Sequence, residues 1–515
     1  MGFFDFNVGI GRAARPGLGC LDTVPMLLEE MDRFDIDAAL VYHMGASEGD
    51  MIDGNDRLLE LIADEPRLHA CWVVAPAFFE DLPSPGKWVS EARAKGVRAF
   101  RLFPRYHLYS LDNARVSQFF THLAVNNMPI LIDFGPRHWS EQSIPWPTIV
   151  RLAKEHASLN IVVVGATVGD VRELSAALDA TENIYVDLHA LIPPEFIAQA
   201  ARAGHHERLL FGTGLPRRAP ECIVTQMRKS DCAASALLEV TAENAMRLLG
   251  LSTSKAKQIS PLAHPDFDVI DVHGHCGSWE RTTSPVKTSA SFVASMDRCG
   301  IAKLVVSSFT AIHGETPTGN AETAAWVSTA PGRLYGYCVI NPNYPAETQD
   351  ELRRCFDEAR GFVGFKFHCE LHGAQLHDDG YAEALAYAND HRLPVLVHGG
   401  GEDRWEEVSE RYPDATFIVA HACAWNGYDR AQRAHFARFR DLRNVVVDVS
   451  GSPAYRGAME QLVELLGPDK ILYGSDFPMF DLGFEVGRIV MSSLDSATQR
   501  AICRDNALRY FRFED

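Results

Sequence analysis

The chain has 515 residues, too many for one ordinary domain, and its 46% hydrophobic and 23% charged residues are typical of a globular protein with a large core. A formal net charge of −19 argues against nucleic acid or an anionic membrane as a partner. No apolar run approaches the roughly 20 residues that span a bilayer, the start does not read as a secretory leader, and the 11 cysteines form no CxxC pair. We therefore expect a cytoplasmic protein with reduced thiols.

Segments of the first half recur in the same order in the second half. The offset between matching residues runs from 256 (Gly165 to His421) to 266 (Asp5 to Asp271), so it drifts only by the length of a loop. The order of seven pairs would not be kept by chance, and the sequence predicts a tandem duplication. The pairs are FFDFNVG with VIDVHGH, GVRAFRLFP with GFVGFKFHC, PILIDFG with PVLVHGG, NIVVVGAT with TFIVAHAC, NIYVDLHA with NVVVDVSG, LLFGTGLP with ILYGSDFP, and ENAMRLLG with DNALRYFR.

Within each half, short apolar runs alternate with longer amphipathic stretches. Runs such as PVLVHG, FIVAHA and VVVDV are uniformly apolar, as strands of a parallel sheet covered on both faces must be. Helical stretches are expected between them, for example over 378–391 and 402–412. Repeated alternation of strand and helix over about 240 residues predicts a (β/α)8 barrel. The chain therefore divides into a first barrel over 1–250, a Ser-, Lys- and Pro-containing linker over 251–267, and a second barrel over 268–515.

Polar residues in the second half stand where the apolar strands end. His273 and His275 are two apart, so on an extended strand they point to one face. His398 ends PVLV, His421 ends FIVA, and Asp476 ends ILYGS. The carboxyl ends of barrel strands meet at one mouth. Imidazoles and a carboxylate that meet there predict a site for zinc or a similar divalent ion.

Together with DVHGH, GSDFP and the closing RDNALRYF, these residues give the second half, about 268–513, a resemblance to the amidohydrolase superfamily. The branch it resembles includes aminocarboxymuconate semialdehyde decarboxylase. The resemblance implies a metal held by His273, His275, His398 and Asp476, with zinc expected and manganese or iron as alternatives. It also implies catalytic roles for Asp476, as a proton shuttle, and for His421, which would hold the attacking water or polarise the substrate carbonyl.

Lys366 and His368, at the end of the fourth strand, are expected to bind substrate. Two other interpretations of Lys366 stay open. A carboxylated lysine on this strand bridges two metals in some members of the superfamily, and a structural ion pair is the third possibility.

The first half lacks the corresponding ligands. The matching positions carry Asn7, Gly9, Asp133, Gly165 and Gly214. One carboxylate and one amide cannot hold a catalytic transition metal, so the first barrel is predicted to be a degenerate copy.

Three roles for this copy are considered. The first is an intramolecular partner that replaces one subunit of a dimer, with further homo-oligomers of the chain allowed; Arg217 or Arg218 could then reach the active barrel. The second is a structural support. The third is a second ligand site built on Arg101, Arg105, His107 and Asp133.

The predicted function is metal-dependent hydrolysis of a small lactone, ester or amide by the second barrel. Non-oxidative decarboxylation of a small unsaturated or aromatic acid is the alternative, because it would use the same ligands. A non-catalytic scaffold is the rival of another class.

Overall fold

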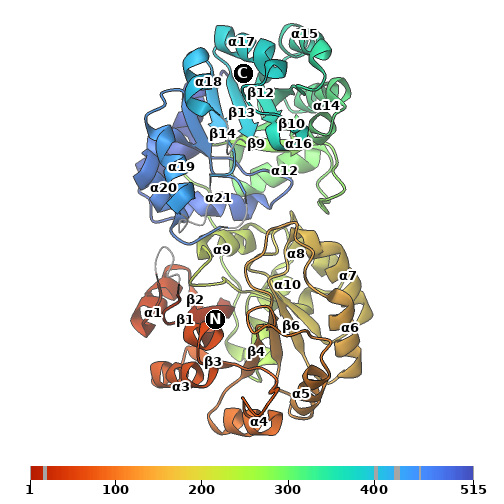
Figure 1. Ribbon diagram of the computed structural model, residues 1–515, viewed down its shortest axis with the longest axis vertical. Helices are drawn as coiled ribbons and strands as arrows, with labels where there is room; N and C mark the ends of the chain where they lie inside the picture. Colours follow the sequence, from red (N-terminus) through yellow and green to blue (C-terminus); the bar gives the residue numbers. More distant parts are fainter. Residues whose placement is uncertain (1, 15–19, 400–403, 423–429, 452–453, 514–515) are drawn as a thin grey trace. The chain divides into compact units, whose positions relative to one another are not determined.

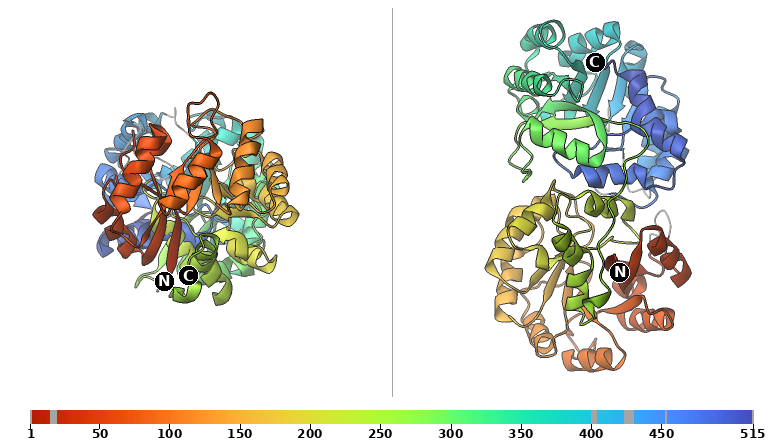
Figure 2. Two further views of the ribbon diagram at one scale, coloured as in Figure 1. Left: turned by 90° about the horizontal axis from the view of Figure 1, so that it is seen from below. Right: turned by 180° about the vertical axis from the view of Figure 1, so that it is seen from behind.

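Two eight-stranded parallel barrels form the computed structural model, which describes residues 2–14, 20–399, 404–422, 430–451 and 454–513. The chain divides into two compact units, Met1–Pro261 and Leu262–Asp515, and each holds one barrel (Figures 1 and 2). The predicted pair of (β/α)8 barrels is confirmed. Among the described residues, no helix has both the length and the apolar character to cross a bilayer.

In each barrel the strands follow one another in chain order, and the last strand lies beside the first. The amide of Phe6 donates to the carbonyl of Phe211 at 2.8 Å, and the amide of Val272 to that of Tyr473 at 3.0 Å, which joins the two ends of each sheet. The first barrel has strands β1 (Phe3–Ile10), β2 (Ile36–His43), β3 (Leu68–Val73), β4 (Ala99–Leu102), β5 (Ile130–Asp133), β6 (Ile161–Val164), β7 (Ile184–Asp187) and β8 (Leu209–Leu210). The second has β9 (Val269–Cys276), β10 (Ile301–Ser308), β11 (Leu334–Val339), β12 (Phe362–His368), β13 (Pro394–His398), β14 (Thr416–Val419), β15 (Val445–Asp448) and β16 (Ile471–Leu472).

Helices cover the outside of the strands in both units (Figure 2). The first unit has α1 (Val24–Arg33), α2 (Met44–Glu48), α3 (Met51–Ile62), α4 (Pro85–Ala94), α5 (Ala114–Val125), α6 (Trp146–Glu155), α7 (Val171–Ala180), α8 (Phe196–Arg202), α9 (Pro220–Lys229), α10 (Ala234–Leu238) and α11 (Asn244–Leu248). The second has α12 (Ser289–Cys299), α13 (Phe309–Ile312), α14 (Thr316–Thr329), α15 (Thr348–Leu352), α16 (Cys369–His372), α17 (Ala382–His391), α18 (Trp405–Arg411), α19 (Arg430–Ala437), α20 (Ala458–Leu466), α21 (Leu482–Val490), α22 (Ser496–Arg500) and α23 (Asn506–Tyr510).

Side chains of the second barrel alternate between its interior and the layer under the helices. Leu396 and Ile418 belong to the apolar cluster inside the barrel. Their neighbours along the strands, such as Val395 and Phe417, belong to the cluster that packs against the helices. This period of two explains why the strands are apolar throughout: both faces of the sheet are buried.

Candidate active site at the mouth of the second barrel

Polar side chains gather where the buried strands of the second barrel end. His273 and His275 lie on β9, Lys366 and His368 on β12, His398 ends β13, His421 follows β14, Asp448 ends β15, and Asp476 follows β16. The pairing of β9 with β10 shifts register between Leu304 and Val306, next to the two histidines. Such irregularities are common beside active sites, where they re-aim side chains.

His273, His275 and Asp476, here called the His–Asp centre, point at one another. His275 Nε2 lies 3.0 Å from Asp476 Oδ1, and His273 Nε2 lies 3.6 Å from the same oxygen. One ligand atom from each residue lies within 4.8 Å of the others, and all three side chains are buried. Two imidazole nitrogens and a carboxylate oxygen at this spacing can hold a divalent cation. These predicted ligands are brought together by the fold.

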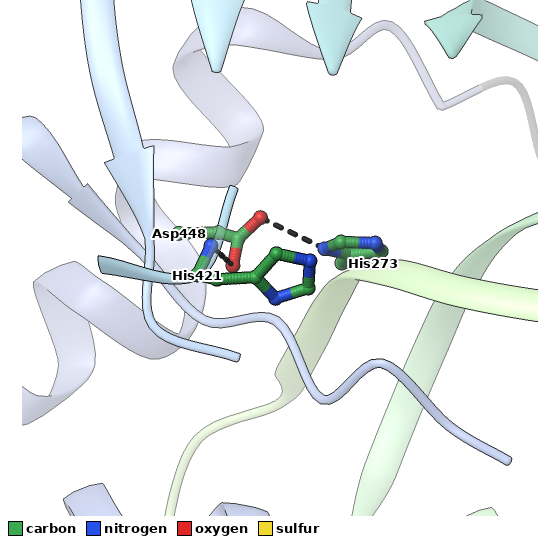
Figure 3. Close-up of side chains that lie close together, drawn as sticks. All are labelled: His273, His421 and Asp448. Carbon is green, nitrogen blue, oxygen red and sulfur yellow. Dashed lines mark hydrogen bonds and ion pairs between the residues drawn. The ribbon is translucent and has the colours of Figure 1, made fainter. Parts of the chain in front are cut away.

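The other ring nitrogen of His273 is held from behind by Asp448 (Figure 3). The distance from His273 Nδ1 to Asp448 Oδ2 is 2.9 Å, and the backbone amide of His421 donates to Asp448 Oδ1 at 3.2 Å. A carboxylate behind a histidine fixes the ring and its tautomer, which leaves Nε2 as the nitrogen available to a metal. His273, His421 and Asp448 form a second group whose ligand atoms lie within 4.8 Å of one another.

His398 lies at the outer side of these groups. Its Nδ1 is 2.8 Å from Nε2 of His421, and its Nε2 is 3.5 Å from Oε2 of Glu370. The ring of His368 stacks on it with centroids 3.9 Å apart. His398 is 28% exposed in its side chain, against 0% for His273. Neither group of potential ligands includes His398, whereas His421 belongs to one of them.

Lys366 lies inside the barrel, beside the His–Asp centre. Its neighbours Phe365 and Phe367 face the helix layer, so alternation along β12 turns Lys366 inward. Its Nζ is 2.9 Å from His273 Nε2, and the side chain is fully buried. Burial lowers the pKa of this ammonium to about 8, so it remains mostly charged at neutral pH.

The electrostatics of the site favour neutral imidazoles and an ionised carboxylate. Burial lowers the pKa of His273 and of His275, and it lowers the pKa of His421 to about 4. Burial alone would raise the pKa of Asp476, but the hydrogen bond from His275 and the nearby histidines lower it overall. These are the protonation states that metal ligands require.

Two of the site residues hold backbone conformations that favour glycine. The φ angles of His421 and Asp476 are 66° and 59°. At the matching positions of the first barrel stand Gly165, with φ 93°, and Gly214, with φ 73°. The second barrel therefore keeps side chains where the backbone disfavours them, which is a common property of functional sites.

The mouth of the first barrel has a different set of contacts. Asn7 stands in place of His273 and donates from Nδ2 to Asp187 Oδ1 at 3.1 Å. Asp133 stands in place of His398 and forms an ion pair with Arg101, whose side chain is 3% exposed. Within the described residues of this unit, one group of side chains has the spacing of metal ligands: His206, Glu207 and Glu239. His206 precedes β8, so this group lies at the end of the barrel opposite the mouth.

Two contributors to the site were not recognised from the sequence. Asp448 was matched with Asp187 as part of the repeat, but no role was assigned to it. Ser450 joins several groups: its Oγ lies 2.5 Å from Asp448 Oδ1 and 2.9 Å from His421 Nδ1. The available signal was an aspartate that ends the apolar run VVVD, followed two residues later by a hydroxyl.

A family model described as Amidohydrolase matches residues 47–251 and 270–513, well over half of the chain. The chain belongs to the amidohydrolase family. The resemblance found in the sequence is confirmed, the match in two segments agrees with the duplication, and the protein is an enzyme of this family.

Solved structures that resemble this amidohydrolase each align with about half of it. 2,6-Dihydroxybenzoate decarboxylase from Rhizobium is 15% identical, with 47% of this chain and 98% of that chain covered and a TM-score of 0.39. 5-Carboxyvanillate decarboxylase from Sphingomonas paucimobilis is 14% identical, with coverage of 48% and 100% and a TM-score of 0.39. 4-Oxalomesaconate hydratase from Rhodopseudomonas palustris is 17% identical, with coverage of 47% and 95% and a TM-score of 0.37. No curated protein matches the chain.

Proposed function

We propose that the second barrel is a metal-dependent hydrolase of a small carbonyl substrate, such as a lactone, ester or amide. The observation that carries the proposal is the convergence of His273 Nε2, His275 Nε2 and Asp476 Oδ1 on one point at the mouth. The donor set fits a divalent ion: the imidazoles are neutral, the carboxyl is ionised, and Asp448 orients His273 from behind.

These three residues would hold the ion, and we propose His398 as the fourth ligand once its contact with His421 is broken. The expected ion is zinc, with manganese and iron as alternatives. When bound, a divalent ion supplies Lewis acidity and brings the pKa of water to about 7.

The chain's own residues have separable tasks. Asp476 is ionised and buried beside the ligands, so it can accept the proton of the attacking water and deliver it to the leaving group. His421 is neutral at pH 7, and Ser450 holds its Nδ1. Its Nε2 contacts His398 and would become a partner for water or for the substrate carbonyl once that contact is broken. Lys366 and His368 would contact the substrate at the inner and outer sides of the site.

Decarboxylation of a small unsaturated or aromatic acid is a second candidate, and Lys366 favours it. A buried ammonium 2.9 Å from His273 would hold a substrate carboxylate next to the ligands. The same ligand set serves both reactions, so the products distinguish them: ring opening or cleavage of the carbonyl compound in one case, carbon dioxide in the other.

Elemental analysis and a substrate panel test the proposal. We expect one divalent ion per chain, loss of the ion in His273→Ala, and loss of turnover in Asp476→Asn. Asp187→Asn, at the mouth of the first barrel, is the control and should retain metal and turnover. Two ions per chain, with one lost in Lys366→Ala, would assign Lys366 as a bridge. A folded, metal-free and inactive protein would favour the scaffold and contradict the proposal.

A further inference from the structure

A buried guanidinium occupies the mouth of the first barrel. Arg101 lies on β4, at the position that Lys366 has in the second barrel. Its Nη2 donates to Asn7 Oδ1 at 2.8 Å, and its Nε donates to Asp133 Oδ2 at 3.0 Å, with Nη2 as a second donor to that oxygen. Asn7 and Asp133 stand at two of the ligand positions of the second barrel. A cation that is part of the chain therefore lies between the residues that replace the metal ligands.

Arg101 has donors to spare. Asp133 and Asn7 take up Nε and Nη2, while Nη1 makes no hydrogen bond to any residue that the structure describes. The Arg101 side chain as a whole is 3% exposed. An arginine that already binds one carboxylate on one side can bind a second on its free side, because its five N–H groups form a planar fork.

The Tyr42 hydroxyl is a second free group beside this cation. The guanidinium carbon of Arg101 lies 4.2 Å from the centre of the Tyr42 ring. The hydroxyl has no hydrogen-bond partner among the described residues, and Tyr42 is 8% exposed. It lies 3.2 Å from where a Cβ on Gly9 would be, and Gly9 stands in place of His275. The Met44 sulfur, 2.5 Å from the same point, and the Tyr42 hydroxyl therefore occupy the place that the His275 side chain has in the second barrel.

Aromatic rings continue from this point toward solvent. The Phe103 ring lies 5.3 Å from the Arg101 guanidinium, 5.6 Å from the Tyr42 ring and 5.8 Å from the Tyr106 ring. Tyr106 is 46% exposed and lies near Arg217, which pairs with Glu48. A flat apolar group with one negative end would match this arrangement of rings and donors.

We propose that the mouth of the first barrel binds a small aromatic carboxylate without a metal. The carboxylate accepts from Arg101 Nη1 and from the Tyr42 hydroxyl, and the ring lies against Phe103 and Tyr106. This site is independent of the reaction proposed for the second barrel, because none of its residues contributes to that site.

Isothermal titration calorimetry of the full chain tests the proposal, with benzoate as the probe and benzamide as its neutral match. We expect benzoate to bind before and after treatment with a chelator, and benzamide to bind at least about tenfold more weakly. Lys366→Met, which changes the second barrel alone, should leave this binding unchanged.

Two variants address the first barrel itself. Arg101→Gln combined with Asp133→Asn removes the ion pair as a unit and should abolish binding. Tyr42→Phe removes only a free hydroxyl, so it should fold and weaken benzoate about tenfold; it decides the matter if the double variant does not fold. The proposal is overturned if benzoate shows no binding at about 10 mM, or if Lys366→Met removes the binding while Tyr42→Phe keeps it.

Discussion

The left-handed backbone at His421 permits a stability test that separates the cost of the conformation from the loss of the side chain. His421→Ala and His421→Gly remove the same imidazole and its contact with Ser450. They differ only in whether a Cβ remains at a φ of 66°. The first barrel already carries glycine at this position, Gly165, in the same left-handed conformation.

The expected difference follows from two opposing terms. A Cβ in the left-handed region costs about 1–2 kcal/mol. Glycine loses about 0.4–1 kcal/mol relative to alanine, because its unfolded chain is more flexible. At position 421 the first term outweighs the second, so His421→Gly should be more stable than His421→Ala by about 0.5–1 kcal/mol.

Ala386 provides the control, because it is an exposed residue of α17 with ordinary helical geometry. There, alanine to glycine should lower stability by about 1 kcal/mol. Urea unfolding of the full chain measures the unfolding free energy for both comparisons. The relevant transition is the one that variants in the second barrel shift. If His421→Ala were the more stable of the pair, as at Ala386, the argument that function maintains a strained backbone here would be refuted. Both variants at 421 should be equally inactive.

Three further predictions concern buried groups in the two barrels. Burial raises the pKa of Asp5 to about 7, so its protonated form stabilises the fold at low pH and this stability is lost as the pH rises through 7. Asp5→Asn should reduce the decline in unfolding free energy between pH 5 and 8 by about 2.5 kcal/mol. Urea unfolding at several pH values measures this, and an unchanged slope of unfolding free energy against pH would contradict it. Asp448→Asn should weaken metal binding and activity about 10- to 100-fold because it frees the ring of His273. The matched Asp187→Asn should leave both within about twofold. Equal effects of the two variants in metal titration would contradict the assignment of the site to one barrel. Ser450→Ala should lower kcat about tenfold at constant metal content, because its hydroxyl holds His421; loss of metal instead would show that Ser450 acts on the ligands.

The architecture could be predicted from the sequence because it depends on short-range patterns. Runs such as PVLVH and VVVD are apolar at every position, and the structure buries them on both faces as β13 and β15. The predicted helix over 378–391 is α17 preceded by a short 3-10 turn, Asp379–Tyr381. Since parallel strands end at one mouth, the gathering of His273, His275 and Asp476 also follows from the sequence.

The contacts within the site join residues that are far apart in the sequence, and short sequence patterns do not determine the distances between such residues. Ser450 contacts His421 across 29 residues, and His398 contacts the same ring across 23. Which of these partners a histidine meets is decided by the twist of the barrel and by side-chain rotamers. Lys366 shows the same limit: its strand and its inward direction follow from alternation along β12, but its 2.9 Å contact with His273 does not.

The two barrels differ in the partners that they provide for polar side chains at matching buried positions. The carboxyl ends of the strands hold polar side chains in both units, and a buried polar group without a partner destabilises the fold whether or not the barrel is catalytic. In the first barrel, Asp133 stands in place of His398, and the buried Arg101 supplies its counter-charge. Glycine at 165 and 214 at the same time removes the backbone strain that His421 and Asp476 impose on the second barrel. The polar side chains at the mouth of the first barrel are thus organised around a cation that belongs to the chain.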